Sequence, residues 1–348
     1  MKKIFAMLLI GILLACCGCG AEQDGQKQDG QVRQVRNVDT VMGTVISQTL
    51  YTTEDETETA AEIMELLRKL EEDVLSRRLN TSEVWRLNAA AGSAEGSGLT
   101  AFMEEILERC LEMWRRSDGA FDVTLGSVVS LWDIDSWAAG EMEGMFAPPE
   151  EELLRNALKN CGSGSLDIRG NRLYLPEGAQ LDLGAVGKGI ALDRILVYLQ
   201  EKDEITGAVI SLGGSVLTYG QKPDGGCWNV GIANPGDTAS NVGILTLEGE
   251  WFISTSGDYE RYIEVDGIRY HHIIDPVTGY PADSGVAGVT ILAKDGFLSD
   301  ALSTACFILG EEKGMALAEN FGAEALFVGK DGSITMSRGM KEYYRSGK

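Results

Sequence analysis

Hydrophobic and polar residues recur with two different periods along the chain, and the change of period divides it into a helical first part and a strand-rich second part. In the first part, apolar residues return every three or four positions, which is the spacing of one face of an α-helix. This spacing predicts helices over residues 53–78, 100–116 and 149–160. A run of β-branched residues predicts one strand before them, over residues 41–51.

Short apolar runs bounded by turn residues predominate after residue 170, and they predict a series of strands. The expected strands are 172–175, 208–212, 228–233, 243–247, 251–254, 262–265 and 286–292. Two more helices are expected, over residues 186–201 and 299–321. Runs of helices followed by runs of strands indicate an α+β fold, here a single large domain of mixed or antiparallel sheets with packed helices.

The N-terminus has the pattern of an export signal over residues 1–19: two lysines, an apolar run and a small residue before Cys16. The segment ending at Cys16 resembles the lipobox of bacterial lipoproteins, in which the cysteine carries the lipid. Cys17 and Cys19 are alternative lipidation sites. A simple cleaved signal or a short anchor is the other interpretation.

Residues 20–36 are polar and nearly free of bulky apolar side chains, so we expect a flexible tether there. Residues 37–348 then form the folded domain. A lipid-anchored location at the cell envelope, on the extracytoplasmic face of the membrane, follows from this arrangement.

The formal net charge of -23 disfavours nucleic acid as a partner, because phosphate backbones are held by clustered Lys and Arg. An acidic protein still binds a phosphorylated ligand where a divalent cation supplies the positive charge. Cys110 and Cys306 fall on apolar faces of expected helices, which favours buried free thiols.

Asp300 and Thr304 are four residues apart in an expected helix, so their side chains project from the same face. Carboxylate and hydroxyl oxygens are hard ligands suited to Mg²⁺. The alternative is structural: Ser299 and Asp300 cap the helix and Thr304 packs.

The glycine-rich segment 181–189 runs from a strand into a helix, so it brings backbone amides and Lys188 near the positive end of a helix dipole. Such a turn suits phosphate. It satisfies neither the Walker A pattern nor the dinucleotide fingerprint, and taken alone it is a weak signal.

His272 and Asp275 lie where an expected strand runs into a turn, and each is a candidate proton acceptor. The structural alternative is that both stabilise the turn before Pro276. Asp122 stands in an apolar setting, where an acid needs a partner or a ligand. It is a candidate for a contact with a base or ribose, or else a helix cap.

Taken in order, several segments closely resemble the ApbE family of Mg-dependent FAD:protein FMN transferases. The likeness covers residues 38–340 and is carried by MGT at 42–44, residues 82–88, GAFDVT at 119–124, LDLGAVGKG at 181–189, ISLGG at 210–214, HHIIDPVTG at 271–279 and SDALSTA at 299–305.

The resemblance implies roles for individual residues. It implies metal ligation by Ala185 through its carbonyl and by the side chains of Asp300 and Thr304. His272 corresponds to the histidine of the family's HxxDP signature, and Arg78 stands where many members have an aromatic residue. The FAD-contacting positions implied are Met42, Arg78, Ala120, Phe121, Asp122, Asp182, Lys188 and Ile274.

The activity implied is the transfer of the FMN half of FAD onto a Thr or Ser hydroxyl of an exported flavoprotein, with release of AMP. His272 or Asp275 then accepts the hydroxyl proton, and Lys188 adds positive charge at the diphosphate. Two alternatives stay open: a Mg-dependent FAD pyrophosphatase that yields FMN and AMP, and a lipid-anchored flavin-binding protein without catalysis.

Overall fold

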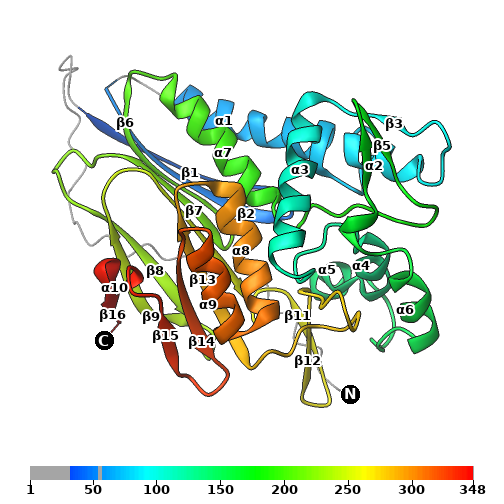
Figure 1. Cartoon of the computed structure of the whole chain (residues 1–348). Coiled ribbons are helices and arrows are strands. Elements are labelled where there is room, and N and C mark those ends of the chain that lie inside the picture. The colour runs from blue at the N-terminus through cyan, green and yellow to red at the C-terminus, as the bar shows by residue number, and fades with distance from the viewer. Residues whose placement is uncertain (1–31, 54–56, 348) are drawn as a thin grey trace.

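An eight-stranded sheet forms the centre of the molecule (Figure 1). The structure, a computed structural model, describes residues 32–53 and 57–347. Every neighbouring pair of strands in the sheet is antiparallel, which confirms the α+β class. In spatial order the strands are β1 (Arg33–Val41), β2 (Thr44–Thr52), β6 (Ile205–Leu212), β7 (Ser215–Gly220), β10 (Trp251–Gly257), β13 (Val286–Ala293), β14 (Glu324–Gly329) and β15 (Ile334–Met336).

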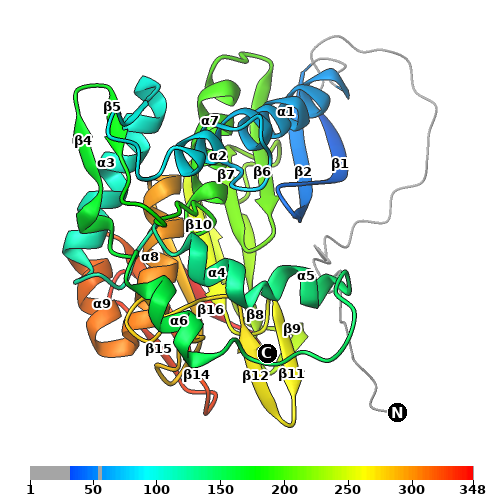
Figure 2. The same ribbon diagram turned by 90° about the vertical axis from the view of Figure 1, so that its right-hand side faces the viewer.

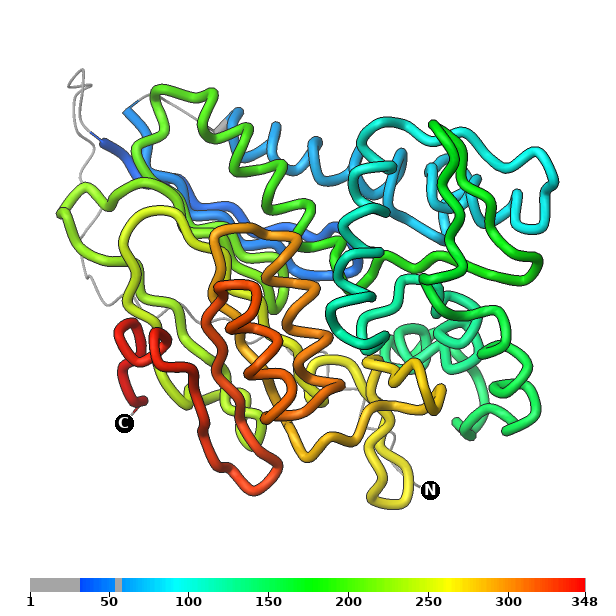
Figure 3. Tube along the Cα trace, viewed as in Figure 1, coloured from blue at the N-terminus to red at the C-terminus, as the bar shows by residue number. Residues whose placement is uncertain are grey.

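Both faces of this sheet are covered, by helices on one side and by a small sheet on the other (Figures 1 and 3). Adjacent residues therefore face different cores: Phe252 belongs to the helix side and Ile253 to the other side. All eight residues of β13 are buried for this reason. The helices are α1 (Thr57–Leu70), α7 (Gly187–Gln200), α8 (Gly296–Leu309) and α9 (Glu311–Asn320); the small sheet is β8 (Trp228–Asn234), β9 (Asp237–Leu247) and β16 (Tyr344–Ser346), next to α10 (Met340–Tyr343).

A third hydrophobic cluster lies away from the main sheet and joins short helices to a β-hairpin. Its centre is Trp132, whose ring is 5.8 Å from that of Tyr270 in the hairpin. Figure 2 shows α4 and α5 above this hairpin. The remaining elements of the described chain are η1 (Glu71–Leu75, a π-helix), α2 (Glu83–Ala89), α3 (Ala101–Arg116), α4 (Gly126–Trp132), α5 (Ile134–Ala139), α6 (Glu151–Leu158), η2 (Ser163–Ser165), the sheet of β3 (Ser97–Gly98), β5 (Arg172–Tyr174) and β4 (Asp167–Arg169), and the hairpin of β11 (Tyr262–Val265) and β12 (Ile268–His271).

Two expected helices have different limits in the structure. The helix expected over 53–78 is α1 followed by the π-helical turn, and it ends at Leu75, which places Arg78 on a loop. The helix expected over 299–321 is two helices, because Gly310 adopts a positive φ of 79° between them. Periodicity alone did not reveal this break, since apolar spacing continues across it.

The first strand begins at Arg33, inside the segment expected to be a tether, and it pairs along its whole length with β2. The tether boundary is therefore corrected to before residue 33. Cys16, the signal region 1–19 and most of the expected tether lie outside the described residues. Within the described ranges, no helix has the length and apolar character needed to cross a membrane.

The expectation for the thiols is confirmed: Cys110 and Cys306 are buried, and neither is in a disulfide.

Helices α7 and α8 cross at two glycines. A β-carbon at Gly189 would lie 2.1 Å from the Gly296 carbonyl oxygen, and one at Gly296 would lie 2.4 Å from the Gly189 carbonyl oxygen. We expect Gly189→Ala to lower the free energy of unfolding by about 1–3 kcal/mol, since overpacking forces the helices apart. Urea denaturation measures this. Gly98→Ala is the control, because a β-carbon there meets no atom within 4 Å; an equal loss at both sites would contradict the crossing.

Candidate active site

A cleft opens between the main sheet's helices and the α4–α5 segment. It gathers most of the residues selected from the sequence. Those that line it are Arg78, Ala120, Phe121, Asp122, Asp182, Ala185, Lys188, His272, Ile274, Asp300 and Thr304. Met42 and Asp275 are not part of its lining.

Asp300 lies on α8 and is 2 % exposed. Its Oδ2 accepts a hydrogen bond from the Gly189 amide at 2.9 Å, and its Oδ1 accepts one from the Ser215 hydroxyl at 3.2 Å. The ammonium of Lys188 is 3.8 Å from Oδ1. A buried carboxylate needs such partners, and the position of Asp300 is fixed from three directions.

The three residues implied as metal ligands fit a hard cation. Thr304 is one helical turn after Asp300 on the same face of α8, and all three border the cleft. In a regular helix the Gly189 amide would donate to the carbonyl of Ala185, four residues earlier. Here it donates to Asp300, which leaves the Ala185 carbonyl oxygen available to a cation. Carboxylate, hydroxyl and carbonyl oxygens form the donor set that Mg²⁺ prefers. This set contains only one carboxylate, and in the described part of the chain no cluster of three or more His, Cys, Asp or Glu side chains could hold a metal.

Paired hydroxyl groups join α8 to the strand beneath it. Ser254 contacts Ser299 at 2.8 Å and Ser256 contacts Ser303 at 2.8 Å, oxygen to oxygen. Thr304 is 3.5 Å from the Ser256 hydroxyl. These contacts connect β10 with the helix residues next to Asp300 and Thr304.

The two adjacent histidines have different surroundings. The Nδ1 of His272 is 3.3 Å from the Arg261 carbonyl oxygen. Because a carbonyl only accepts, this contact assigns the proton to Nδ1 and leaves the lone pair on Nε2. Burial, together with the charges of Arg261 and Lys188, holds the pKa of His272 well below its usual value. His272 is therefore neutral, lines the cleft and can accept a proton.

His271 has a structural role. Its Nε2 is 3.0 Å from the Ala282 carbonyl oxygen, and its Nδ1 accepts from the Ile273 amide at 3.3 Å. Both ring nitrogens are occupied, and the side chain is buried. The sequence could not tell the two histidines apart by residue type; their hydrogen-bond partners do.

Asp275 builds a turn outside the cleft. Its Oδ1 accepts from the Val277 amide at 2.8 Å, and its carbonyl accepts from the Gly279 amide at 2.8 Å. It follows β12, which ends at His271, so neither Asp275 nor His272 is within a strand as the sequence suggested. This geometry matches the structural alternative for Asp275.

Met42 lies in the tight turn between β1 and β2 with a φ of 54°, and its amide donates to Glu71 at 2.9 Å. Its methyl group lies 3.6 Å from an ideal β-carbon at Gly187, the first residue of α7. Met42 thus borders the start of the helix that carries Lys188, outside the cleft lining.

Asp122 organises its own loop and faces the cleft. Its Oδ1 accepts from the Thr124 amide at 2.8 Å, the Thr124 hydroxyl at 2.6 Å and the Ser163 hydroxyl at 2.7 Å. Three donors on one oxygen fix the carboxylate and leave Oδ2 for other contacts. Asp122 does not cap a helix, since α4 begins at Gly126 and has no side-chain cap.

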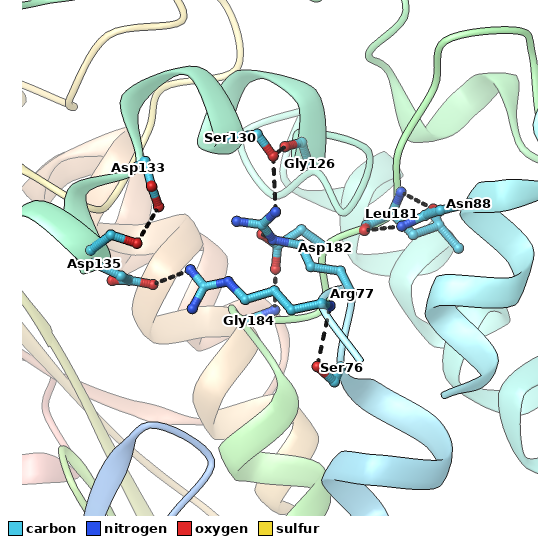
Figure 4. A network of polar contacts seen from close by, with 12 residues as sticks. Ser76, Arg77, Asn88, Gly126, Ser130, Asp133, Asp135, Leu181, Asp182 and Gly184 are labelled. Atoms are coloured by element: carbon cyan, nitrogen blue, oxygen red, sulfur yellow. Dashed lines mark hydrogen bonds and ion pairs between the residues drawn. The ribbon is translucent and has the colours of Figure 1, made fainter. Parts of the chain in front are cut away.

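Two consecutive arginines, Arg77 and Arg78, follow the π-helical turn and line the cleft. Figure 4 shows Arg77 beside Asp182 and Ser130. The Arg77 Nε lies 2.8 Å from Oδ2 of Asp182, and the Arg77 Nη1 donates to the Ser130 hydroxyl at 2.9 Å. The sequence pattern does not single out Arg77, because a charged pair at the end of a helical pattern resembles a solvated face. The helical segment ends at Leu75, earlier than expected, and Arg77 therefore points into the cleft.

Arg78 and Arg261 bind the same carboxylate on α5. Asp135 accepts from Arg78 at 3.2 Å through Oδ2 and from Arg261 at 2.7 Å through Oδ1. All three residues line the cleft, and sequence analysis had selected only Arg78. No local sequence pattern indicates that Asp135 binds Arg78 and Arg261, which are 57 and 126 positions away from it in the chain.

Glu260 is another residue of the cleft that the sequence did not reveal. Burial raises the pKa of this carboxyl, and the nearby charges of Lys188 and Arg261 oppose the rise. It adds a second carboxyl group close to Asp300.

The profile of the ApbE family matches residues 42–327. A protein of Treponema pallidum named FAD:protein FMN transferase is 35 % identical and aligns over 99 % of this chain and 97 % of its own length. A protein of the same name from Vibrio cholerae is 34 % identical over 81 % of this chain and 82 % of that protein.

Solved structures agree. The ApbE protein of Thermotoga maritima superposes with a TM-score of 0.80 at 30 % identity, covering 91 % of this chain and all of that one. The flavin transferase ApbE of Vibrio cholerae gives a TM-score of 0.79 at 30 % identity, covering 90 % of this chain and all of that one. The chain belongs to the ApbE family.

Proposed function

We propose that this chain is an FAD:protein FMN transferase that uses Mg²⁺, acts on an exported flavoprotein, and is anchored by lipid at Cys16 on the extracytoplasmic face of the cell envelope. One observation carries the chemistry: a single cleft brings together hard oxygen ligands, a lysine and a neutral histidine. The names of the relatives support FAD as donor and a protein as acceptor. The N-terminal pattern supports the anchor.

In this proposal, the cation is held by Ala185, Asp300 and Thr304. When bound, it neutralises the diphosphate and polarises the phosphorus–oxygen bonds. Lys188 adds a second positive charge near the same oxygens. Asp182 and Asp122, which also line the cleft, contact the nucleotide.

The acceptor hydroxyl forms a new bond to the phosphorus of the FMN half, and the bond from that phosphorus to the AMP oxygen breaks. AMP leaves with the electron pair. His272 accepts the hydroxyl proton on Nε2, which its contact with Arg261 leaves unprotonated.

Because His272 is neutral, we expect the rate of FMN transfer to change little as the pH falls from 8 to 6. A base of ordinary histidine pKa would lose activity as the pH falls through about 6.5. Because the pKa of His272 is lowered, the unprotonated form persists below that value, and kcat should change less than about twofold between pH 8 and pH 6. Stopped assays of FMN transfer measure this profile; a fall of about fourfold by pH 6, which is what a base of pKa about 6.5 would give, would contradict the assignment.

Mass spectrometry tests the function itself. The full-length protein in detergent, incubated with FAD, Mg²⁺ and a flavoprotein acceptor, should add one FMN to a Thr or Ser of the acceptor. AMP should appear in equal amount. Rapid AMP release without acceptor would instead support the pyrophosphatase, and FAD binding without either product would support the non-catalytic binder.

A further inference from the structure

We propose that Asp193 is a positioning residue that fixes the carboxylate of Asp300 by joining the middle of α7 to the N-terminal end of α8. The inference rests on the proposed function, because that function assigns Asp300 to the metal. Asp193 itself is not part of the cleft lining, so it acts through its partners.

The side chain of Asp193 belongs to α7 but caps α8. Its Oδ1 accepts from the Gly296 amide at 2.7 Å, and its Oδ2 accepts from the Phe297 amide at 2.9 Å. The third amide of α8, that of Leu298, donates to Asp295 at 2.7 Å. The first turn of α8 is therefore held by two carboxylates, one of them from the neighbouring helix.

Asp300 makes the reverse connection. It belongs to α8, and its Oδ2 accepts from Gly189, the third residue of α7. The residue before α7, Val186, provides no side-chain cap. Each helix thus supplies a carboxylate to the first turn of the other, and the carboxylate supplied by α8 is the proposed metal ligand.

The close crossing at Gly189 and Gly296 makes this pair of reciprocal caps rigid. Both glycines are also hydrogen-bond donors in it, Gly189 to Asp300 and Gly296 to Asp193. Backbone atoms in contact cannot shift without disturbing both bonds. Loss of the bond at Gly296 should therefore be felt at Gly189.

The surroundings of Asp193 disfavour its negative charge. Burial, and next the charge of Asp295, raise the pKa of Asp193 to about 6. Arg109 lies 2.6 Å from Asp295 and offsets part of this repulsion. A neutral capping residue would satisfy amides without placing two carboxylates together. An aspartate at this position, despite the repulsion from Asp295, is explained if one rigid carboxylate must accept hydrogen bonds from two amides of the helix that carries Asp300.

Hydrogen exchange tests the coupling without metal. In full-length Asp193→Asn, one carboxylate oxygen becomes an amide that cannot accept, so the Gly296–Phe297 end loosens. We expect faster exchange in the peptide containing Gly189 as well, on the other helix. Thr100→Ala is the matched control, because it removes the N-cap of α3, and the Thr100 hydroxyl makes no hydrogen bond to α7 or α8.

Metal binding gives the second readout. Mn²⁺ binding to the full-length protein with FAD, followed by electron paramagnetic resonance of the free ion, should weaken about 10- to 100-fold in Asp193→Asn, the range found when groups that orient a metal ligand are lost. Asp193→Ala should weaken it at least as much. Thr100→Ala should bind Mn²⁺ as the unaltered protein does.

The outcomes separate the two proposals. If the unaltered protein binds no Mn²⁺, the metal assignment falls, and the role of Asp193 falls with it. If the unaltered protein binds Mn²⁺ and Asp193→Asn binds it equally well with unchanged exchange at Gly189, only the role of Asp193 is refuted. The two readouts distinguish this role from general destabilisation, which Thr100→Ala reproduces.

Discussion

Asp300→Ala should reduce the rate of FMN transfer on the order of 10³-fold and abolish the response to Mg²⁺. The metal supplies several kcal/mol of charge stabilisation, and each 1.4 kcal/mol lost is about tenfold in rate. The variant also leaves the Gly189 amide and Lys188 without their carboxylate partner. Single-turnover assays at increasing Mg²⁺ concentration measure the loss.

Asp331→Ala is the control for this experiment. Asp331 is an acid of the turn between β14 and β15, where it accepts from Ser333 at 2.9 Å outside the cleft lining. Its removal should leave transfer unchanged. Full activity of Asp300→Ala at ordinary Mg²⁺ concentration would refute the proposed metal site.

His272→Gln should reduce transfer by about 10²- to 10⁴-fold, the usual contribution of a general base. FAD affinity should change only a few-fold, because glutamine keeps a polar group of similar size in the cleft. Fluorescence titration with FAD and the transfer assay separate the two effects.

His271→Gln should behave in the opposite way. His271 satisfies the Ala282 carbonyl and the Ile273 amide in a buried position, so its replacement should lower stability by about 1–3 kcal/mol and alter kcat little. Equal losses of kcat in the two variants would show that His272 is not the proton acceptor.

Sequence analysis located the chemistry better than it located the limits of the elements. Short ordered motifs placed Asp300, Thr304, Lys188 and His272, and the structure brings them to one cleft. Local spacing sufficed there, because each motif carries its own turn or helix start. The helix break at Gly310 had no such signal, since the apolar spacing persists on both sides of it.

Partners distant in the chain could not be predicted. Arg77 meets Asp182, and Asp135 meets Arg261, through contacts that depend on how the layers pack. Asp275 is a different case: an acid beside a candidate base suggested catalysis, and in the structure its carboxylate holds a turn outside the cleft lining. Residue type defines what a side chain can do, and only its partners show which of these roles it has.

The serine pairs between β10 and α8 have a consequence for the origin of the site's precision. Ser299 and Ser303 are four residues apart on a helix, a rise of about 6 Å; Ser254 and Ser256 are two apart on a strand, about 6.6 Å. The two repeats nearly coincide, so both pairs form in one alignment and a slip by a single turn breaks at least one of them. An oily interface would tolerate sliding. Here the two directional hydrogen bonds fix the position of α8 along β10.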